Sequence, residues 1–409
     1  MTRSEQPAEK SKFSIWLLTF PLFFINFLVF SEHLIVVPLT ASISLATGLP
    51  PVNSGLLVAI YPLAAALSAL ILAPFSDRLG RKRMLVLLCL GFSFSSYNFA
   101  TADSVTSVLL FRVLSGIFGG PIPANVLAYV GDRFQGAERT KVITTIMLAF
   151  SVASILAVPF GAWIADLTTW RVPFYIISGI ILVCLVLMLR MRVVKTGAEG
   201  GNIFRQYVEF ANLLKLGRVR KVFTLQFFMI IGLFGFVPNV AVWLSTNYGF
   251  DSTQIGLCYM QGGIGGIIGN TLSGYFINKG HKGRLITIGS LVMCVFLAFS
   301  AQDFLPPVYS GIFFFGLMLG GSFRIPALQV IITEIIPINL RGRMMALSMI
   351  VSNITMGLGG IWSIPFLKLE NGVLTGMKAI TLIGSISLLA VPFLVSILEK
   401  EIRQVKQFY

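Results

Sequence analysis

The sequence predicts an all-α membrane protein with twelve transmembrane helices arranged as two six-helix repeats. Three observations lead to this fold class. The 409-residue chain is 56% hydrophobic and only 11% charged, which leaves too few polar side chains to cover a soluble globule of that size. Long apolar segments recur along the whole chain. The two halves of the sequence also match one another at an offset of 201 to 202 residues.

Each predicted helix is an apolar segment of the length that a bilayer requires. A hydrocarbon core about 30 Å thick needs roughly 20 residues per helix. The first half supplies six such segments: Phe13–Leu39, Ser54–Pro74, Met84–Ala102, Ser107–Val130, Val142–Ala165 and Val172–Leu189. The second half supplies six more: Val222–Tyr248, Gln254–Ile277, Leu285–Ala301, Val308–Thr333, Met344–Leu367 and Lys378–Leu398.

The basic residues predict the topology. Of the 31 Lys and Arg residues, 26 lie in the two tails or in the connections that follow even-numbered helices. Only Arg171, Lys368 and Lys378 fall on the other side, while Arg112 and Arg324 lie within helices. This asymmetry is the positive-inside rule, so we expect both termini in the cytoplasm. The net charge of +15 is then expected to meet anionic lipid headgroups rather than nucleic acid.

The longest connection divides the chain into its two repeats. Residues 190–221 carry eight Lys or Arg residues and a Gly-rich break at Gly197–Gly201. We therefore expect an N-terminal bundle (1–189), a cytoplasmic basic linker (190–221) and a C-terminal bundle with its tail (222–409). Across the linker Asp77 matches Asn278, Gly119-Gly120 matches Gly320-Gly321, and Arg139 matches Arg341.

A basic turn joins the second and third predicted helices. It reads Asp77-Arg78-Leu-Gly80-Arg81-Lys-Arg, and a weaker copy, Asn278-Lys279-Gly280, joins the eighth and ninth. A carboxylate at this helix end can accept from backbone donors and face the positive N-terminus of a neighbouring helix. Gly80 permits the left-handed turn that reverses the chain. These residues predict a contact between helices at the membrane surface.

This turn resembles the signature loop between helices 2 and 3 of the major facilitator superfamily. Leu109–Gly116, which contains Arg112, resembles the arginine segment of helix 4 in that family. Val158-Pro159-Phe160-Gly161 and the turn from Trp170 to Phe174 resemble segments of its twelve-helix drug-proton antiporter and sugar-efflux branch. The resemblance implies parallel halves with a substrate site between them at the midplane, lined by helices 1, 4, 7 and 10. It also implies a multi-pass protein of the plasma membrane, here a bacterial inner membrane.

The same resemblance implies a conformational latch that holds the cytoplasmic side closed. The residues that we assign to it are Asp77, Arg78, Gly80, Arg81, Asp132, Arg139, Asn278, Lys279, Glu334 and Arg341. The alternative is that the loop is only a topology signal, in which Asp77 balances Arg78.

Charges inside helices are the main functional candidates, because burying a charge in a membrane is costly. They are Glu32, Arg112 and Arg324. A low-dielectric site favours the protonated carboxyl, so Glu32, with His33 and Arg112, is our candidate for proton coupling. The alternatives are a permanent salt bridge that fixes helix packing, a hydrated position for Glu32, and a packing role for His33.

Arg324 is the candidate clamp for an anionic or zwitterionic substrate, because a guanidinium presents a fixed fork to carboxylate or phosphate. The alternative is that it neutralises Glu32 or binds backbone carbonyls near Pro326. Neutral polar residues on the expected cavity helices complete the predicted substrate site: Asn26, Asn125, Tyr129, Asn239, Trp243 and Gln329.

Other motifs restrict the function. The glycine run Gly262–Gly269 follows no strand and lacks a Gly-Lys-Ser/Thr ending, so a nucleotide loop is not expected. Gly262, Gly266, Asn270 and Gly274 recur every four residues and predict a close-packing seam on helix 8. The four isolated cysteines predict no disulfide framework and no metal site. Without a Walker motif, we expect the energy to come from an ion gradient or from the substrate's own gradient.

These observations predict a secondary transporter that works by alternating access, most simply a proton-coupled exporter of a small organic molecule. The alternatives on the same fold are a proton-coupled importer and a lipid or glycolipid flippase. A non-transporting sensor is a further alternative. A membrane enzyme is not expected, because the only histidines are His33 and His281. We expect no cofactor besides the proton, and a functional monomer in the lipid bilayer.

Overall fold

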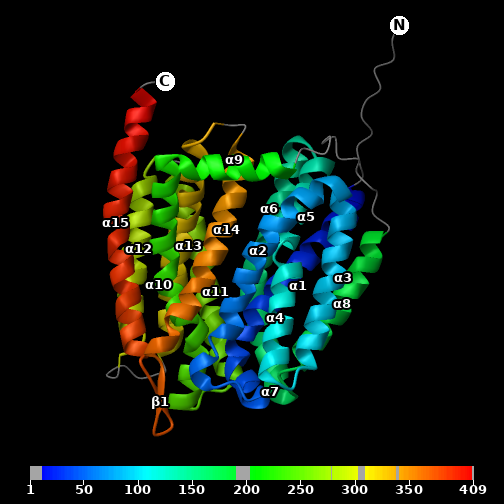
Figure 1. The fold of residues 1–409 in the computed structure, drawn as a ribbon, viewed down its shortest axis with the longest axis vertical. Helices are drawn as coiled ribbons and strands as arrows, with labels where there is room; N and C mark the ends of the chain where they lie inside the picture. Colours follow the sequence, from blue (N-terminus) through cyan, green and yellow to red (C-terminus); the bar gives the residue numbers. More distant parts are fainter. Residues whose placement is uncertain (1–11, 190–202, 278, 303–308, 338–339, 408–409) are drawn as a thin grey trace.

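The computed structural model describes residues 12–189, 203–277, 279–302, 309–337 and 340–407. Two helical bundles stand side by side, one from each half of the chain (Figure 1). Helix α9 (Ile203–Lys215) lies across one end of the molecule, and the strand β1 (Lys368–Glu370) lies at the other end. We call these the linker end and the far end.

The N-terminal bundle contains the six predicted spans. They are α1 (Lys12–Thr47), α2 (Leu56–Leu79), α3 (Arg81–Ala100), the pair α4 (Val105–Gly119) and α5 (Ile122–Arg133), the pair α6 (Gly136–Val152) and α7 (Val158–Leu167), and α8 (Val172–Leu189). A short 3₁₀ turn, Pro51–Asn53, precedes α2. The turn between α2 and α3 has Gly80 at a φ of 85°, which agrees with the predicted left-handed reversal.

The C-terminal bundle contains the other six spans. They are α10 (Gly217–Tyr248), α11 (Ser252–Ile277), α12 (Lys282–Phe299), α13 (Ser310–Glu334), α14 (Arg341–Trp362) and α15 (Met377–Gln407). Eleven helices of the described chain are long and apolar enough to cross a membrane. The twelfth predicted span, α11, has 26 residues and is therefore about 39 Å long, but it is not among these eleven.

Both bundles are packed in the same way, as the sequence repeat predicts. In the first bundle α2 packs on α4, and α3 packs on α4 and α8. The equivalent contacts in the second are α11 with α13, and α12 with α13 and α15. Matching ion pairs lie at the linker end, Arg81–Asp132 at 3.6 Å and Lys282–Glu334. These two pairs are related by the sequence offset of 201 to 202 residues.

The structure adds breaks that the apolar pattern does not reveal. The fourth span is interrupted between α4 and α5, where Pro121 precedes the first residue of α5. The fifth span contains a π-helical turn, Ala153–Ala157, just before Pro159. Proline lacks the N–H that would continue the helical ladder, and such positions commonly carry kinks or π-bulges. The described part of the linker contains the amphipathic helix α9, and β1 pairs with β2 (Val373–Thr375).

The two bundles meet toward the far end. Asp166 Oδ2 accepts from the backbone N–H (2.7 Å) and the hydroxyl (2.6 Å) of Thr253, at the start of α11. The hydroxyls of Ser42 and Ser252 lie 3.5 Å apart. Gly360 on α14 leaves no room for a Cβ beside Ala59 on α2. These contacts join the two bundles at the far end of the molecule.

At the linker end, described side-chain contacts link the two halves through α9. Tyr207 donates from its hydroxyl to Leu70 O on α2 (3.3 Å), and Glu209 pairs with Arg343 on α14 (2.8 Å). Helix α9 therefore connects a helix of one bundle to a helix of the other.

The glycine seam of α11 is real, but its composition differs from the prediction. Added Cβ atoms at Gly262, Gly265 and Gly269 would meet backbone atoms of α13, and one at Gly266 would lie 3.2 Å from Ser322 Oγ of the same helix, whereas one at Gly274 would meet nothing. The predicted Gly262 and Gly266 thus face α13, but the seam also includes Gly265 and Gly269 and does not reach Gly274, because a straight helix face drifts between spacings of three and four. All four cysteines are buried packing residues.

Candidate functional site

The centre of the candidate site is an ion pair inside the N-terminal bundle. Arg112 on α4 donates from Nη1 to Glu32 Oε1 on α1 at 2.8 Å. Both side chains are fully buried, with exposed fractions of 0%. Such a pair persists in an apolar interior only when further hydrogen bonds satisfy the two ions.

Arg112 is held by several groups besides Glu32. Its Nε donates to Leu57 O on α2 at 2.8 Å, and its Nη2 lies 3.1 Å from His33 Nδ1. The guanidinium carbon lies over the rings of Tyr61 (4.7 Å) and Phe99 (5.8 Å). Because a guanidinium has only donors, His33 Nδ1 must act as the acceptor, which places the imidazole proton on Nε2.

His33 and Tyr61 complete this polar cluster. The His33 ring stacks on the Tyr61 ring with centroids 4.4 Å apart. His33 is partly exposed, unlike Glu32 and Arg112. The sequence predicted Glu32, His33 and Arg112 as one group, and the structure brings all three together. It missed Tyr61, for which the only signal was an aromatic hydroxyl near the start of an apolar helix.

Glu32 has one carboxylate oxygen free to accept. Its Oε1 receives the hydrogen bond from Arg112, whereas its buried Oε2 has no hydrogen-bond partner among the described residues. An unsatisfied buried acceptor is costly. The site therefore contains a buried carboxylate with one oxygen still available to a hydrogen-bond donor.

Arg324 lies in the other bundle, so the alternative in which it neutralises Glu32 is wrong, and the backbone carbonyl that it meets is that of Met229 rather than one near Pro326. Arg324 is 3% exposed and sits inside the C-terminal bundle. It donates from Nη1 to Ser290 Oγ on α12 (3.0 Å) and from Nη2 to Met229 O on α10. Its Nε has no hydrogen-bond partner among the described residues. The physical reason is that α13 packs within its own bundle, whereas Glu32 belongs to the other.

The neutral residues of the predicted substrate site are spread over both bundles. Asn26 and Asn125 donate to carbonyls of their own chain segments, Leu22 O (3.3 Å) and Pro121 O (3.0 Å). Asn239 donates to Ser363 Oγ at 2.8 Å and lies beside Gly55 of the other bundle. Tyr129 is buried, and Trp243 makes an edge contact with Tyr248.

Three of these amides present unused acceptors. Asn26 Oδ1, Asn239 Oδ1 and Gln329 Oε1 are buried without hydrogen-bond partners in the described chain. Their role in substrate binding stays a prediction.

The latch residues fall into three groups. The side chains of Asp77 and Arg78 and all of Asn278 lie outside the described residues. Arg81–Asp132 and Lys282–Glu334 are ion pairs within a bundle. Arg139 packs over Gly131, and a Cβ added at Gly131 would lie 3.1 Å from Arg139 Nη2. Lys279 donates to Tyr275 Oη at 2.9 Å. Arg341 is exposed at the start of α14.

A contact at the far end was missed by the sequence reasoning. Asp166 bonds the first turn of α11 across the bundle interface, where a carboxylate also meets the positive end of the helix dipole. Sequence alone showed only an acid in a short loop. No local pattern indicates that its partner is 87 residues away.

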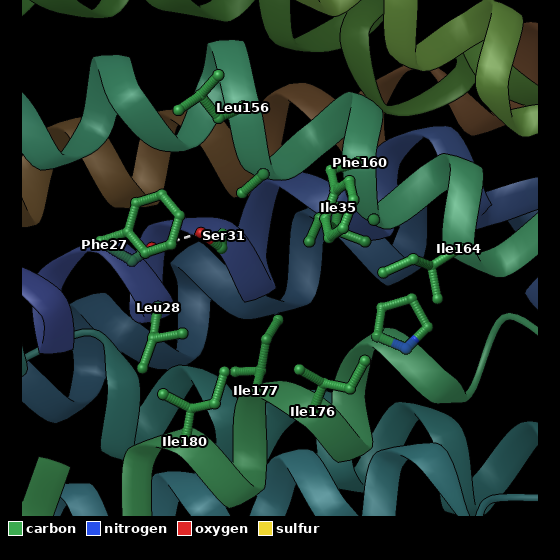
Figure 2. A pocket seen from close by; sticks show the side chains of 13 residues that line it. Phe27, Leu28, Ser31, Ile35, Leu156, Phe160, Ile164, Ile176, Ile177 and Ile180 are labelled. Carbon is green, nitrogen blue, oxygen red and sulfur yellow. Dashed lines mark hydrogen bonds between the residues drawn. The ribbon is translucent and has the colours of Figure 1, made fainter. Parts of the chain in front are cut away.

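A lateral pocket lies in the N-terminal bundle, and none of Glu32, His33 and Arg112 lines it. It has a volume of about 350 Å³ and lies between α1, α7 and α8 (Figure 2). Its lining is apolar except for Ser31, the residue before Glu32, whose hydroxyl donates to Phe27 O at 2.6 Å. Leu156 and Phe160 from the kinked fifth span line its other side. The pocket therefore suits an apolar body rather than a polar headgroup.

Comparison with known proteins agrees with this architecture. The Major Facilitator Superfamily model matches residues 20–360. The chain is 26% identical over 349 residues to the MFS-type transporter YceJ of Bacillus subtilis (strain 168), covering 82% of this chain and 86% of the relative. It is 26% identical to Multidrug resistance protein 1 of the same organism, over 59% of this chain and 62% of the relative.

A solved structure of the nucleoside transporter NupG has the same fold. The superposition has a TM-score of 0.74 at 13% identity and covers 93% of this chain and 99% of that structure. Family model, relatives and fold agree along most of the chain. The protein therefore belongs to the Major Facilitator Superfamily and is a multi-pass plasma-membrane transporter, not an enzyme.

Proposed function

We propose that this transporter exports a small organic molecule in exchange for protons, with Glu32 as the proton carrier. The observation that carries the proposal is the fully buried Glu32–Arg112 pair, in which Glu32 Oε2 has no described partner. Intramembrane carboxylates of this kind commonly belong to proton relays.

The chemistry of coupling follows from the contacts of Arg112. When Glu32 is charged, Arg112 attracts it and ties α1 to α4. When Glu32 binds a proton, Arg112 keeps the Leu57 carbonyl and His33, but the charge attraction between the two helices is lost. Because α1 also contacts α10 and α11 of the other bundle, this change can bias the closure of the two bundles.

Export is supported by relatives named for drug resistance, such as Multidrug resistance protein 1. The far end is predicted to face away from the cytoplasm, and there the hydrogen bonds from Thr253 to Asp166 join the two bundles. The apolar lateral pocket, which is lined by the residue before Glu32, favours a substrate with a lipophilic body. Arg324 would add a preference for an anionic or zwitterionic group, once it is released from Ser290 and Met229 O.

The clamp role of Arg324 has its own test. Replacing the guanidinium by a point charge, Arg324→Lys, removes the bidentate fork. We expect affinity for an anionic ligand to fall about tenfold, since a charge-assisted bidentate contact becomes a single one. Affinity for a neutral ligand of similar size serves as the control. Equal affinities of the anionic ligand for both proteins would remove Arg324 from the substrate site.

The coupling experiment begins with a ligand. A thermal-shift screen of the purified protein against organic acids, amino acids, sugars and cationic dyes identifies binders, because a ligand of the folded state raises apparent stability. The protein is then placed in liposomes with a pH-sensitive dye inside, and substrate flux and proton flux are recorded under an imposed pH gradient. We expect substrate and protons to move in opposite directions.

The decisive variant is Glu32→Gln, which keeps the shape but cannot ionise. We expect it to abolish uphill transport while substrate exchange at equal concentrations persists. The matched control is Asp103→Asn, which removes an exposed carboxylate paired with Arg171 at 2.6 Å. Uphill transport that survives in Glu32→Gln would move the coupling site elsewhere. Fluxes in the same direction would indicate an importer, and movement of labelled lipid alone would indicate a flippase.

A further inference from the structure

A second pocket lies at the linker end of the C-terminal bundle, away from the ion pair. It has a volume of about 240 Å³ and lies between the end of α11, the beginning of α12 and α13. All of its charged or titratable lining residues are basic: Lys279, His281 and Arg284. Its walls are apolar and include Phe276, Ile288 and Phe323.

The basic residues are not neutralised by nearby acids. In the described chain, neither Lys279 nor Arg284 has a carboxylate within ion-pair distance, while the neighbouring Glu334 is taken by Lys282. Glu399 lies beside Gly283, on the α15 side of the turn. Lys279 is held in place by the hydroxyl of Tyr275 at 2.9 Å and by the ring face below it at 4.3 Å.

The apolar walls continue away from this basic rim toward the middle of the membrane. On α12, exposed apolar side chains follow at Ile288, Leu291 and Val295, spaced so that they share one face. On α11, the exposed apolar side chains of Phe276, Leu272 and Ile268 also share one face. The pocket thus has a cationic rim at the depth of headgroups and apolar stripes at the depth of acyl chains.

We propose that this pocket binds an anionic phospholipid of the leaflet at the linker end. Lys279 and Arg284 would hold the phosphate, and the stripes on α11 and α12 would contact the acyl chains. Basic pockets between transmembrane helices recognise anionic headgroups through this combination of charge and burial. A soluble phosphate would use the rim but not the stripes, so the apolar walls favour a lipid.

The test measures lipid binding to the purified full-length protein by native mass spectrometry. Dioleoylphosphatidylglycerol is the anionic probe, dioleoylphosphatidylcholine is the neutral one, and glycerol 1-phosphate is the soluble one. The variant is Lys279→Gln/Arg284→Gln. The matched control is Lys215→Gln/Arg220→Gln, which removes two exposed charges at the same end but outside the pocket.

We expect the pocket variant to bind phosphatidylglycerol about thirtyfold more weakly than the unmodified protein does, since each of the two basic groups adds an attraction to anionic lipid. The control should keep its affinity, and phosphatidylcholine should bind all proteins alike. An equal loss in both variants would mean that surface charge in general attracts the lipid. Displacement of the lipid by glycerol 1-phosphate would assign the rim to a soluble anion instead. Arg284→Gln alone repeats the test if the double variant does not purify as a folded protein.

Discussion

The Glu32–Arg112 pair makes a quantitative prediction about stability. Glu32→Gln leaves the Arg112 guanidinium buried without its counter-ion. Two unit charges about 4 Å apart attract by about 4 kcal/mol at the effective dielectric constant of a protein, and breaking a buried pair costs about 3 to 5 kcal/mol.

The contacts that remain in Glu32→Gln indicate where in that range its loss of stability should fall. The amide that replaces the carboxylate in Glu32→Gln would keep an oxygen at the position of Oε1, and Arg112 would keep Leu57 O, His33 and the Tyr61 ring. We therefore expect the lower limit, about 3 kcal/mol. At about 2 °C per kcal/mol for a chain of this size, the unfolding midpoint should fall by about 6 °C.

The assay is thermal unfolding of the purified protein in a neutral detergent at a fixed scan rate, because irreversible unfolding makes the midpoint depend on the rate. Glu32→Gln, Arg112→Gln and the double variant form a cycle. The double variant leaves no unpaired charge, so it should cost about 2 kcal/mol less than the sum of the single changes.

Two results would refute this reasoning. The first is a midpoint for Glu32→Gln that equals that of Asp103→Asn, in which the lost carboxylate is 81% exposed and the expected cost is below about 1 kcal/mol. The second is strict additivity in the cycle, which would mean that the two charges do not interact.

Three further predictions concern other charged residues. Arg324→Ala combined with Glu32→Gln should be additive to within about 0.5 kcal/mol in the same unfolding assay, since the two residues share no partner; a rescue would mean that they do pair. Asp166→Asn should weaken the bonds to Thr253, and distances between spin labels at the far end of α7 and α11 should then lengthen; unchanged distances would exclude a closing role. Glu209→Gln should free α9 from Arg343. Amide hydrogen exchange in residues 203–215 should then be severalfold faster than in the control variant Glu138→Gln. Equal exchange rates in the two variants would mean that the Arg343 contact does not hold α9.

The sequence by itself predicted the twelve spans, the two halves and the sharp turn at Gly80. These features depend on local and additive properties: the length of apolar segments against the bilayer, the distribution of Lys and Arg, and the freedom of glycine at positive φ. It also identified Glu32, His33 and Arg112 together, because charges inside apolar helices are conspicuous wherever they occur. The membrane topology and the roles of these residues stay predictions.

The sequence could not decide which arginine meets Glu32. Two were available, Arg112 and Arg324, and both lie inside apolar segments. The choice depends on helix packing: α4 carries Arg112 toward α1, whereas α13 turns Arg324 toward α10 and α12. In the same way, the partner of Asp166 lies on a helix of the other bundle.

The helix breaks and the linker helix α9 are also features that the sequence analysis did not predict. The sequence contains Pro121 and Pro159, but a hydropathy pattern does not show where a helix is interrupted, since hydropathy is insensitive to backbone geometry. Helix α9 was not predicted, because the linker that contains it was identified from its basic residues and not from an amphipathic pattern. Composition and periodicity thus determined which segments cross the membrane. Only the tertiary structure decided which side chains face one another, because long-range pairing depends on how every helix packs against its neighbours.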